Sequence, residues 1–450
     1  MPLGTVTTPE SPATIPRKHL LKRGREFVSR YLESSVFRSG IGLADQAIVS
    51  GSRFVATILL GRVCGADQLG QYGLGFTVIV LIACIQNSLV TLPYTVFAPG
   101  KQRRRSGFYA GSVFLQYVTL AVLASLLVGA CSMTRVAMLG GSELVEVFAA
   151  IAVVAPAILL WEYSRRFGFA SLNAGRVLIL DCGAAIAFIG GLLGLAMFER
   201  LSAANAYLAM GAAYGLVSGI WLLRRKRRFR FSLSLARREL RPHWQFGRWV
   251  FASETALMAR SYVVPWMVAA WMDETATGIF VAYATIVVLA NPVLIGLSNV
   301  LAPDLAFTFA SEGVIGVRRF VFRTTSVVSA GMLAFAVMLT VVGERLITTA
   351  YGSDFGGYQM CVAILSLGIL AEAIGMPSYT GLWSIGRPHL CFVACLAGLA
   401  ITVGLTAALT SRFGITGAAV GYTSGKILSA LLQIIAFMRV TRPVIQGVNG

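Results

Sequence analysis

Apolar runs about 20 residues long recur along almost the whole of this 450-residue chain. Each run is long enough for an α-helix to cross the hydrocarbon core of a bilayer. We place twelve of them, at residues 43–64, 72–98, 107–131, 143–164, 176–198, 203–224, 247–271, 279–305, 319–343, 358–380, 387–410 and 415–438. Only 13% of the residues are charged, against about 25% in soluble domains. The sequence therefore predicts an all-α polytopic membrane protein with twelve transmembrane helices.

The basic residues are distributed unevenly between the two sides of the membrane. With twelve spans both termini share one side, and 30 of the 38 lysines and arginines fall there, against five on the other side. This asymmetry places both termini in the cytoplasm. The formal net charge of +19 is thus a topology signal, and it gives no reason to expect nucleic acid as a partner. Anionic lipids at the cytoplasmic face are the expected partners instead.

The same pattern predicts the domain organisation. The expected parts are a cytoplasmic disordered tail with a basic surface helix (1–40), an N-terminal six-helix lobe (41–224), a basic cytoplasmic connector (225–246), a C-terminal six-helix lobe (247–440) and a cytoplasmic tail (441–450). Residues 17–38 mix basic and apolar positions at roughly helical spacing. This mixture fits either a helix on the membrane surface or a solvated linker.

The second half of the chain repeats the first. "GAAYGLVSG" at 211–219 matches "GAAVGYTSG" at 417–425 in six of nine positions, and residues 69–81 align with 277–289 at an offset of 208. Spans pair as n and n+6, so the two halves have the same orientation and form a parallel repeat. Two six-helix lobes facing each other enclose a central cavity that can open to either side. This is the architecture of a transporter.

Three basic residues lie inside predicted spans: Arg53, Arg260 and Lys426. An arginine in lipid is costly, so these side chains should face an interior cavity or pair across helices, and both explanations remain open. The forked guanidinium donors of Arg53 and Arg260 suit phosphate or pyrophosphate. Lys426 either lines the same cavity or snorkels, and all three are candidate substrate-binding residues. The intramembrane acids Asp45, Glu254 and Glu372 are candidates for ion coupling.

Further charged residues lie nearer the span ends. Asp181 should be satisfied by water or a basic neighbour, and Glu162, Arg165 and Arg166 are expected at the interface. No Walker A, GxSxG, HExxH or dinucleotide-binding motif occurs, so we expect neither enzymatic activity nor a cofactor. The seven cysteines include no CxxC pair, and no metal site is expected. Transport would then run on an ion gradient, the membrane potential or the substrate gradient.

Three stretches resemble the polysaccharide-transport (O-antigen flippase) family of the MOP flippase superfamily. They are "LADQAIVSGSRFVATILLGRVCGADQLGQYGLGF" (43–76), "YGSDFGGYQMCVAILSLGIL" (351–370) and "GRPHLCFVACLAGLAITVGLTAALTSRFGITGAAVGYTSG" (386–425). The resemblance implies a V-shaped pair of lobes working by alternating access in the bacterial inner membrane. It implies a polyprenyl-pyrophosphate-linked oligosaccharide as substrate, for O-antigen, capsule or exopolysaccharide synthesis. It leaves a polysaccharide polymerase open as a partner.

Three other functions compete with a flippase. A MATE-type exporter of small cations would use the three intramembrane acids, although the cavity arginines would repel its substrates. A major-facilitator carrier also has two parallel six-helix lobes, but the loop "APGKQRRRSG" lacks the acidic-glycine signature expected there. An inner-membrane glycosyltransferase or ligase would have larger periplasmic loops than this sequence predicts.

Overall fold

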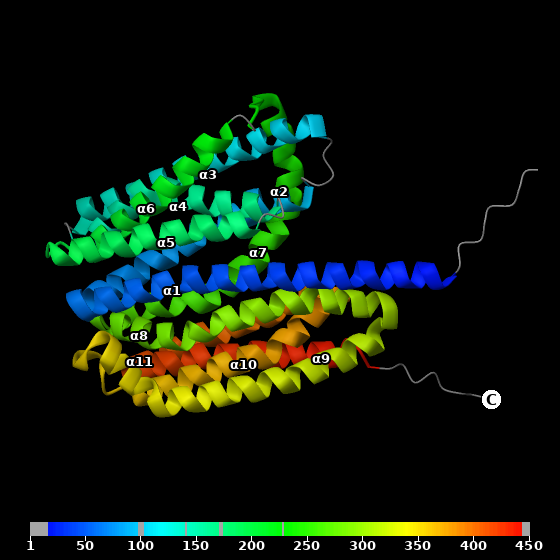
Figure 1. Cartoon of the computed structure of the whole chain (residues 1–450). Coiled ribbons are helices and arrows are strands. Elements are labelled where there is room, and N and C mark those ends of the chain that lie inside the picture. The colour runs from blue at the N-terminus through cyan, green and yellow to red at the C-terminus, as the bar shows by residue number, and fades with distance from the viewer. Residues whose placement is uncertain (1–16, 98–102, 140–141, 171–173, 227–228, 443–450) are drawn as a thin grey trace, which may run out of the picture.

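A computed structural model describes residues 17–97, 103–139, 142–170, 174–226 and 229–442, and the predicted tail over 1–16 and most of the tail over 441–450 lie outside them. Within these ranges every regular element is a helix (Figure 1). The α-helices are α1 (Arg17–Gln86), α2 (Leu92–Phe97), α3 (Arg103–Leu139), α4 (Glu143–Ala170), α5 (Ala174–Met197), α6 (Ala203–Arg225), α7 (Leu233–Trp271), α8 (Glu274–Val287), α9 (Asn291–Tyr351), α10 (Gln359–Ser384) and α11 (Pro388–Val440). Short helical turns occupy Asn87–Thr91, Val288–Ala290 and Ser353–Phe355.

Three long helices are each two helices joined at a glycine. The chain breaks at Gly65 in α1, Gly313 in α9 and Gly414 in α11, where φ is 86°, 67° and 56°. These left-handed backbone angles are accessible to glycine because it has no Cβ. Each break falls in a gap between two predicted spans.

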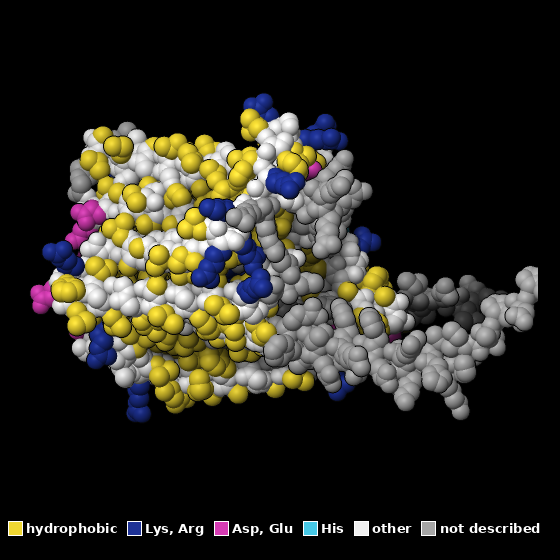
Figure 2. Space-filling model, turned by 45° about the horizontal axis from the view of Figure 1, so that its top comes forward, with side chains coloured by type: hydrophobic (Ala, Val, Ile, Leu, Met, Phe, Trp, Pro, Cys, Tyr) yellow, Lys and Arg dark blue, Asp and Glu magenta, His cyan; other side chains and the backbone are white. Residues whose placement is uncertain are grey.

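Nine stretches of the described chain are long and apolar enough to cross a membrane. The breaks at Gly65 and Gly414 divide two of these into pairs. With the α7 segment, which contains Glu254 and Arg260 and is not one of the nine, the described helices match the twelve predicted spans. The predicted all-α polytopic fold is therefore confirmed. Figure 2 shows a broad apolar flank suited to lipid, with acidic side chains at one end.

The helices form two groups with α1 between them (Figure 1). One group contains α3 to α6, and the other contains α8 to α11. Residue Arg17 of α1 and Val440 of α11 lie at the same end of the bundle, which we call the termini face; the opposite end is the far face. α1 runs without a break through residues 17–38 into the first span, so the predicted surface helix and that span are one element.

The two lobes meet at the far face through residues that the repeat relates. A Cβ on Gly70 would collide with the carbonyl oxygen of Glu274, and a Cβ on Gly278 would collide with that of Ala66. The Thr275 hydroxyl donates to Asp67 across the same contact, at 2.9 Å. Each partner lies 208 residues after its counterpart, which is the offset of the sequence repeat. Two glycines thus let the second span and α8 touch along their backbones.

Further hydrogen bonds close the far face between the lobes. The Gln71 amide donates to Glu274 across the lobes at 2.6 Å, and to Glu143 within the N-terminal lobe at 3.0 Å. The Arg62 guanidinium donates to the carbonyl oxygen of Thr349 at 2.6 Å. The far face is therefore held shut by polar contacts around a glycine-lined backbone contact, and opening it requires these contacts to break.

Replacing both Gly70 and Gly278 by alanine is expected to push the lobes apart at the far face, because neither methyl group has space against the opposing backbone. Spin labels at residues 199 and 412, both exposed at this face, report the inter-lobe distance after the native cysteines are replaced. The distance distribution should shift to longer values in the variant. Gly194→Ala is the matched control, since a Cβ there meets nothing within 4 Å. An unchanged distribution in the double variant would contradict the proposed contact.

Candidate functional site

Three of the predicted site residues form one charged cluster inside the C-terminal lobe. The Lys426 ammonium on α11 lies 2.7 Å from one carboxylate oxygen of Glu372 on α10, and Arg260 on α7 lies 3.4 Å from the other. The Arg260 and Lys426 side chains are 4% and 6% exposed, whereas that of Glu372 is 35% exposed. The cluster therefore carries one uncompensated positive charge, and its carboxylate is the member most open to solvent.

Arg53 lies in the N-terminal lobe in a different environment. Its guanidinium stacks over the rings of Phe76 and Trp161, with centroids 5.3 and 5.8 Å away, a cation–π arrangement. Its Nε atom is buried and has no hydrogen-bond partner among the described residues. Within the same part of the chain no carboxylate forms an ion pair with it. Aromatic faces hold this arginine in place, and Glu162 interacts with it electrostatically without forming an ion pair.

An aromatic contact joins the two basic positions across the lobes. The rings of Phe76 and Tyr262 meet edge to face at 6.3 Å, and Tyr262 interacts electrostatically with Arg53 on one side and with Lys426 and Glu372 on the other. The sequence repeat predicted Arg53 and Arg260 as approximate counterparts. The structure distinguishes them, because Arg260 forms an ion pair with Glu372 and Arg53 forms none with any residue of the described ranges. For Arg260, the alternative of pairing across helices is the arrangement observed.

A second buried cluster, centred on Arg165, lies within the N-terminal lobe. Arg165 on α4 binds Asp181 on α5 at 2.6 Å through Nε and Asp45 on α1 at 2.9 Å through Nη2. Its Nη1 lies 3.5 Å from Glu162. The sequence placed Arg165 at the interface, but only 8% of it is exposed because the three acids and the Trp161 ring, 4.7 Å away, enclose it. That prediction is wrong.

The two aspartates of this cluster are only partly satisfied. In each of Asp45 and Asp181, Oδ2 receives a hydrogen bond from Arg165. Their Oδ1 atoms are buried and have no hydrogen-bond partner among the described residues. Two carboxylates that share one guanidinium favour the uptake of a proton or a small cation, because the second negative charge is poorly compensated.

Glu254, the remaining ion-coupling candidate, stands apart from both clusters. It is half-buried on α7 and forms no ion pair with described residues, although it interacts electrostatically with Arg166 of the N-terminal lobe. Of the six predicted site residues, the structure joins Arg260, Glu372 and Lys426, and it places Asp45 and Arg53 in the opposite lobe.

Sequence reasoning missed Arg165 and Asp181 as members of a buried site. Both lie close to span ends, at the end of α4 and the start of α5, where charged residues usually reach water. One feature of the sequence could have indicated this cluster. Asp45, like Arg165 and Asp181, lies near the end of a predicted span in the N-terminal half, so the two acids and the arginine could meet within one lobe.

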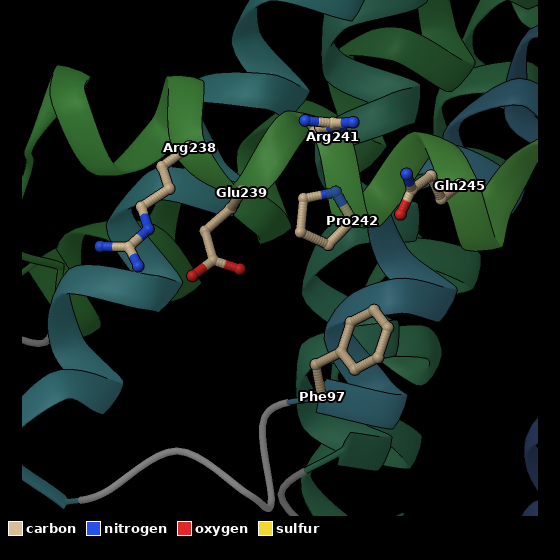
Figure 3. A pocket seen from close by; sticks show the side chains of 6 residues that line it. All are labelled: Phe97, Arg238, Glu239, Arg241, Pro242 and Gln245. Atoms are coloured by element: carbon tan, nitrogen blue, oxygen red, sulfur yellow. The ribbon is translucent and has the colours of Figure 1, made fainter.

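A surface hollow of about 400 Å³ lies outside these clusters, at the start of α7 (Figure 3). Its lining residues are Phe97, Arg238, Glu239, Arg241, Pro242 and Gln245.

Several solved transporter structures share this arrangement of helices. An inward-facing multidrug resistance MATE family transporter of the MOP superfamily superposes with a TM-score of 0.74, at 14% identity over 88% of this chain and 94% of its own. A MOP superfamily transporter from Pyrococcus furiosus, whose binding pocket is described as reversed in polarity, gives 0.66 at 14% identity over 91% and 95%. The chain has the fold of these transporters. No family model matches the sequence, and neither does any curated protein.

A further solved structure of the same fold represents another conformation of such a transporter. An outward-facing structure of a MATE family transporter gives a TM-score of 0.66 at 13% identity over 91% of this chain and 95% of its own. In this chain the two lobes contact each other directly at the far face. The described conformation is closed at the far face.

Proposed function

We propose that the chain translocates a polyprenyl-pyrophosphate-linked oligosaccharide across the bacterial inner membrane by alternating access, with both termini in the cytoplasm. Such a substrate would serve the synthesis of an O-antigen, capsule or exopolysaccharide. The observation that carries this proposal is the charge between the lobes. Arg260 and Lys426 share the single carboxylate of Glu372 in the C-terminal lobe, and Arg53 in the N-terminal lobe forms no ion pair with a described residue. Tyr262 interacts with both groups.

This charge balance suits an anionic headgroup. Arg53 interacts electrostatically with Glu162 but forms no ion pair with a described residue, so a pyrophosphate would bind it without displacing an ion pair. Arg260 and Lys426 share a single carboxylate, and a second anion bound between them would neutralise the remaining positive charge. The aromatic rings of Phe76 and Tyr262 between the two positions would contact the apolar or sugar portions of the substrate.

The N-terminal cluster is proposed to supply ion coupling. Asp45 and Asp181 each keep one unpartnered buried oxygen, so a proton shared between them would relieve their repulsion. Glu372 is a weaker coupling candidate than the sequence indicated, because it already compensates two cations.

An ion-coupled exporter of small cations is the second candidate. The partly satisfied aspartates favour it, as do structural neighbours that are named multidrug resistance MATE transporters. The excess of positive charge between the lobes argues against it, since a cationic substrate would meet Arg53 first.

Arg53→Ala is expected to reduce translocation about 10- to 100-fold, because a charge-assisted hydrogen bond to the headgroup is worth about 1.5–3 kcal/mol. The measurement is restoration of surface glycan in a flippase-deficient strain of matched glycan type, at equal membrane abundance. Arg412→Ala, an exposed arginine at the far face, is the matched control and should restore glycan like the unaltered chain. Full restoration of surface glycan by Arg53→Ala would show that Arg53 does not bind the substrate.

A further inference from the structure

The first part of α7 crosses the termini face of the bundle. Figure 1 shows it running roughly perpendicular to the spans, from the side of α3 and α2 towards the C-terminal lobe. We call residues 233–246 the crossing segment. Ser232 caps it by accepting a hydrogen bond from the backbone N–H of Leu235. A helix lying across the end of a transmembrane bundle lies parallel to the membrane plane.

One face of the crossing segment is docked on the N-terminal lobe. His243 is buried between α3 side chains. Its Nε2 lies 2.9 Å from the Tyr109 hydroxyl, and its Nδ1 lies 2.9 Å from the side-chain oxygen Oε1 of Gln116. Ala236, seven residues earlier on the same face, is also buried. The segment is therefore fixed in orientation about its own axis, and its other faces point away from the protein.

A flank of the crossing segment, about 70° around the helix from the buried face, carries an apolar stripe. Leu233, Leu240 and Trp244 are 62%, 51% and 56% exposed. Their spacings of seven and four residues place them within about 40° of each other on the helix. Scattered exposed apolar residues are ordinary, but three large ones on one line of a helix at a membrane surface match a helix buried to the depth of the headgroups.

Arginines border this stripe. Arg237, four residues after Leu233, and Arg241, one residue after Leu240, are both exposed. They lie on the side of the stripe that is away from the buried face. Arg238 and Arg241 also line the hollow of about 400 Å³, in which Glu239 is the acidic lining residue (Figure 3). The hollow therefore has a net positive lining next to an apolar edge.

We propose that the crossing segment is a binding site for anionic phospholipid of the leaflet at the termini face. The stripe of Leu233, Leu240 and Trp244 lies among the upper acyl carbons, and Arg237 and Arg241 bind the headgroup phosphates. The occupant is a lipid because the apolar stripe and the basic side chains are adjacent, and a free phosphate would use only the arginines. This lipid site is separate from the two buried charged clusters and from Arg53, and it is independent of the substrate proposed above.

Lipid bound here would also act on the transport cycle. The crossing segment is docked on the N-terminal lobe through His243, and the same helix continues into the C-terminal lobe as far as Arg260 and beyond. A lipid that holds this segment at the interface restricts the movement of one lobe relative to the other.

Native mass spectrometry of the whole protein with phosphatidylglycerol tests the site. The double variant Arg237→Gln/Arg241→Gln should bind the tightest phosphatidylglycerol about 25-fold more weakly, about fivefold for each arginine. Arg412→Gln, at the far face, should bind it unchanged, and phosphatidylcholine adducts should not distinguish the variants. Trp244→Ser should weaken binding while all arginines remain.

Three results would overturn the proposal. One is phosphatidylglycerol binding by the double arginine variant equal to that of the unaltered chain. Another is full displacement of the lipid by millimolar inorganic phosphate, which would indicate a simple anion site. The third is an unchanged affinity in Trp244→Ser, which would remove the apolar stripe from the site. The thermal unfolding midpoint of each variant, measured without added lipid, separates lost binding from lost folding.

Discussion

Arg165→Ala is expected to lower the free energy of unfolding by about 3–5 kcal/mol, the cost of breaking a buried ion pair by removing one partner. The substitution leaves Asp45 and Asp181 facing each other inside the N-terminal lobe, where each already has one unpartnered oxygen. It also removes the guanidinium from the face of Trp161. Thermal unfolding followed by size-exclusion chromatography in mild detergent measures the effect. Most of the variant should be lost at temperatures that the unaltered chain withstands.

The second variant needed is Arg165→Ala/Asp181→Asn, which removes one of the stranded charges. It should recover a substantial part of the lost stability, because only Asp45 then remains as an aspartate without its cation. Arg166→Ala is the matched control, since Arg166 is the exposed neighbour on the same helix. A double variant no more stable than Arg165→Ala alone would indicate that Arg165 acts through packing on Trp161.

Glu372→Gln is expected to have the second largest effect, lowering the free energy of unfolding by about 2 kcal/mol. It leaves Arg260 and Lys426 without their shared carboxylate, with side chains only 4% and 6% exposed. The loss should be smaller than the 3–5 kcal/mol of a fully buried pair, because the Glu372 side chain is 35% exposed. Thermal unfolding monitored by tryptophan fluorescence measures the change, and the exposed Glu146→Gln is the control.

The same variant also tests the anion site. Inorganic pyrophosphate should raise the unfolding midpoint of Glu372→Gln more than that of the unaltered chain, because the ligand replaces the missing negative charge. Lys426→Gln/Glu372→Gln should be more stable than Glu372→Gln alone, as both members of the 2.7 Å pair are removed together. Equal stabilisation by pyrophosphate in all of these chains would place the anion elsewhere.

The sequence predicted the fold well because the bilayer imposes simple constraints. The length of each apolar run, the uneven distribution of lysine and arginine between the two sides of the membrane, and the internal repeat can each be identified from the order of residues in the sequence. The residues of the inter-lobe contact are related by the same offset of 208, Gly70 to Gly278 and Asp67 to Thr275, but the repeat alone did not predict that they touch. The glycine breaks at Gly65 and Gly414 likewise fall between predicted spans.

The site was harder to predict because it depends on which helix faces meet. Arg260 and Glu372 are 112 residues apart, and Arg165 and Asp45 are 120 apart. Neither pairing has a sequence signature. Arg165 was misplaced for a further reason: a charge near a span end is usually solvated, and only the packing of α1, α4 and α5 encloses this one.

Reconstituted transport tests the central claim that the charge between the lobes selects an anionic lipid-linked substrate. Proteoliposomes would receive either a fluorescent polyprenyl-pyrophosphate oligosaccharide or a small cationic dye, each under the same imposed proton gradient. The account predicts transfer of the pyrophosphate lipid between leaflets, abolished in Arg53→Ala/Arg260→Ala and retained in Arg412→Ala. Movement of the dye without movement of the pyrophosphate lipid would contradict it and establish a cation exporter instead.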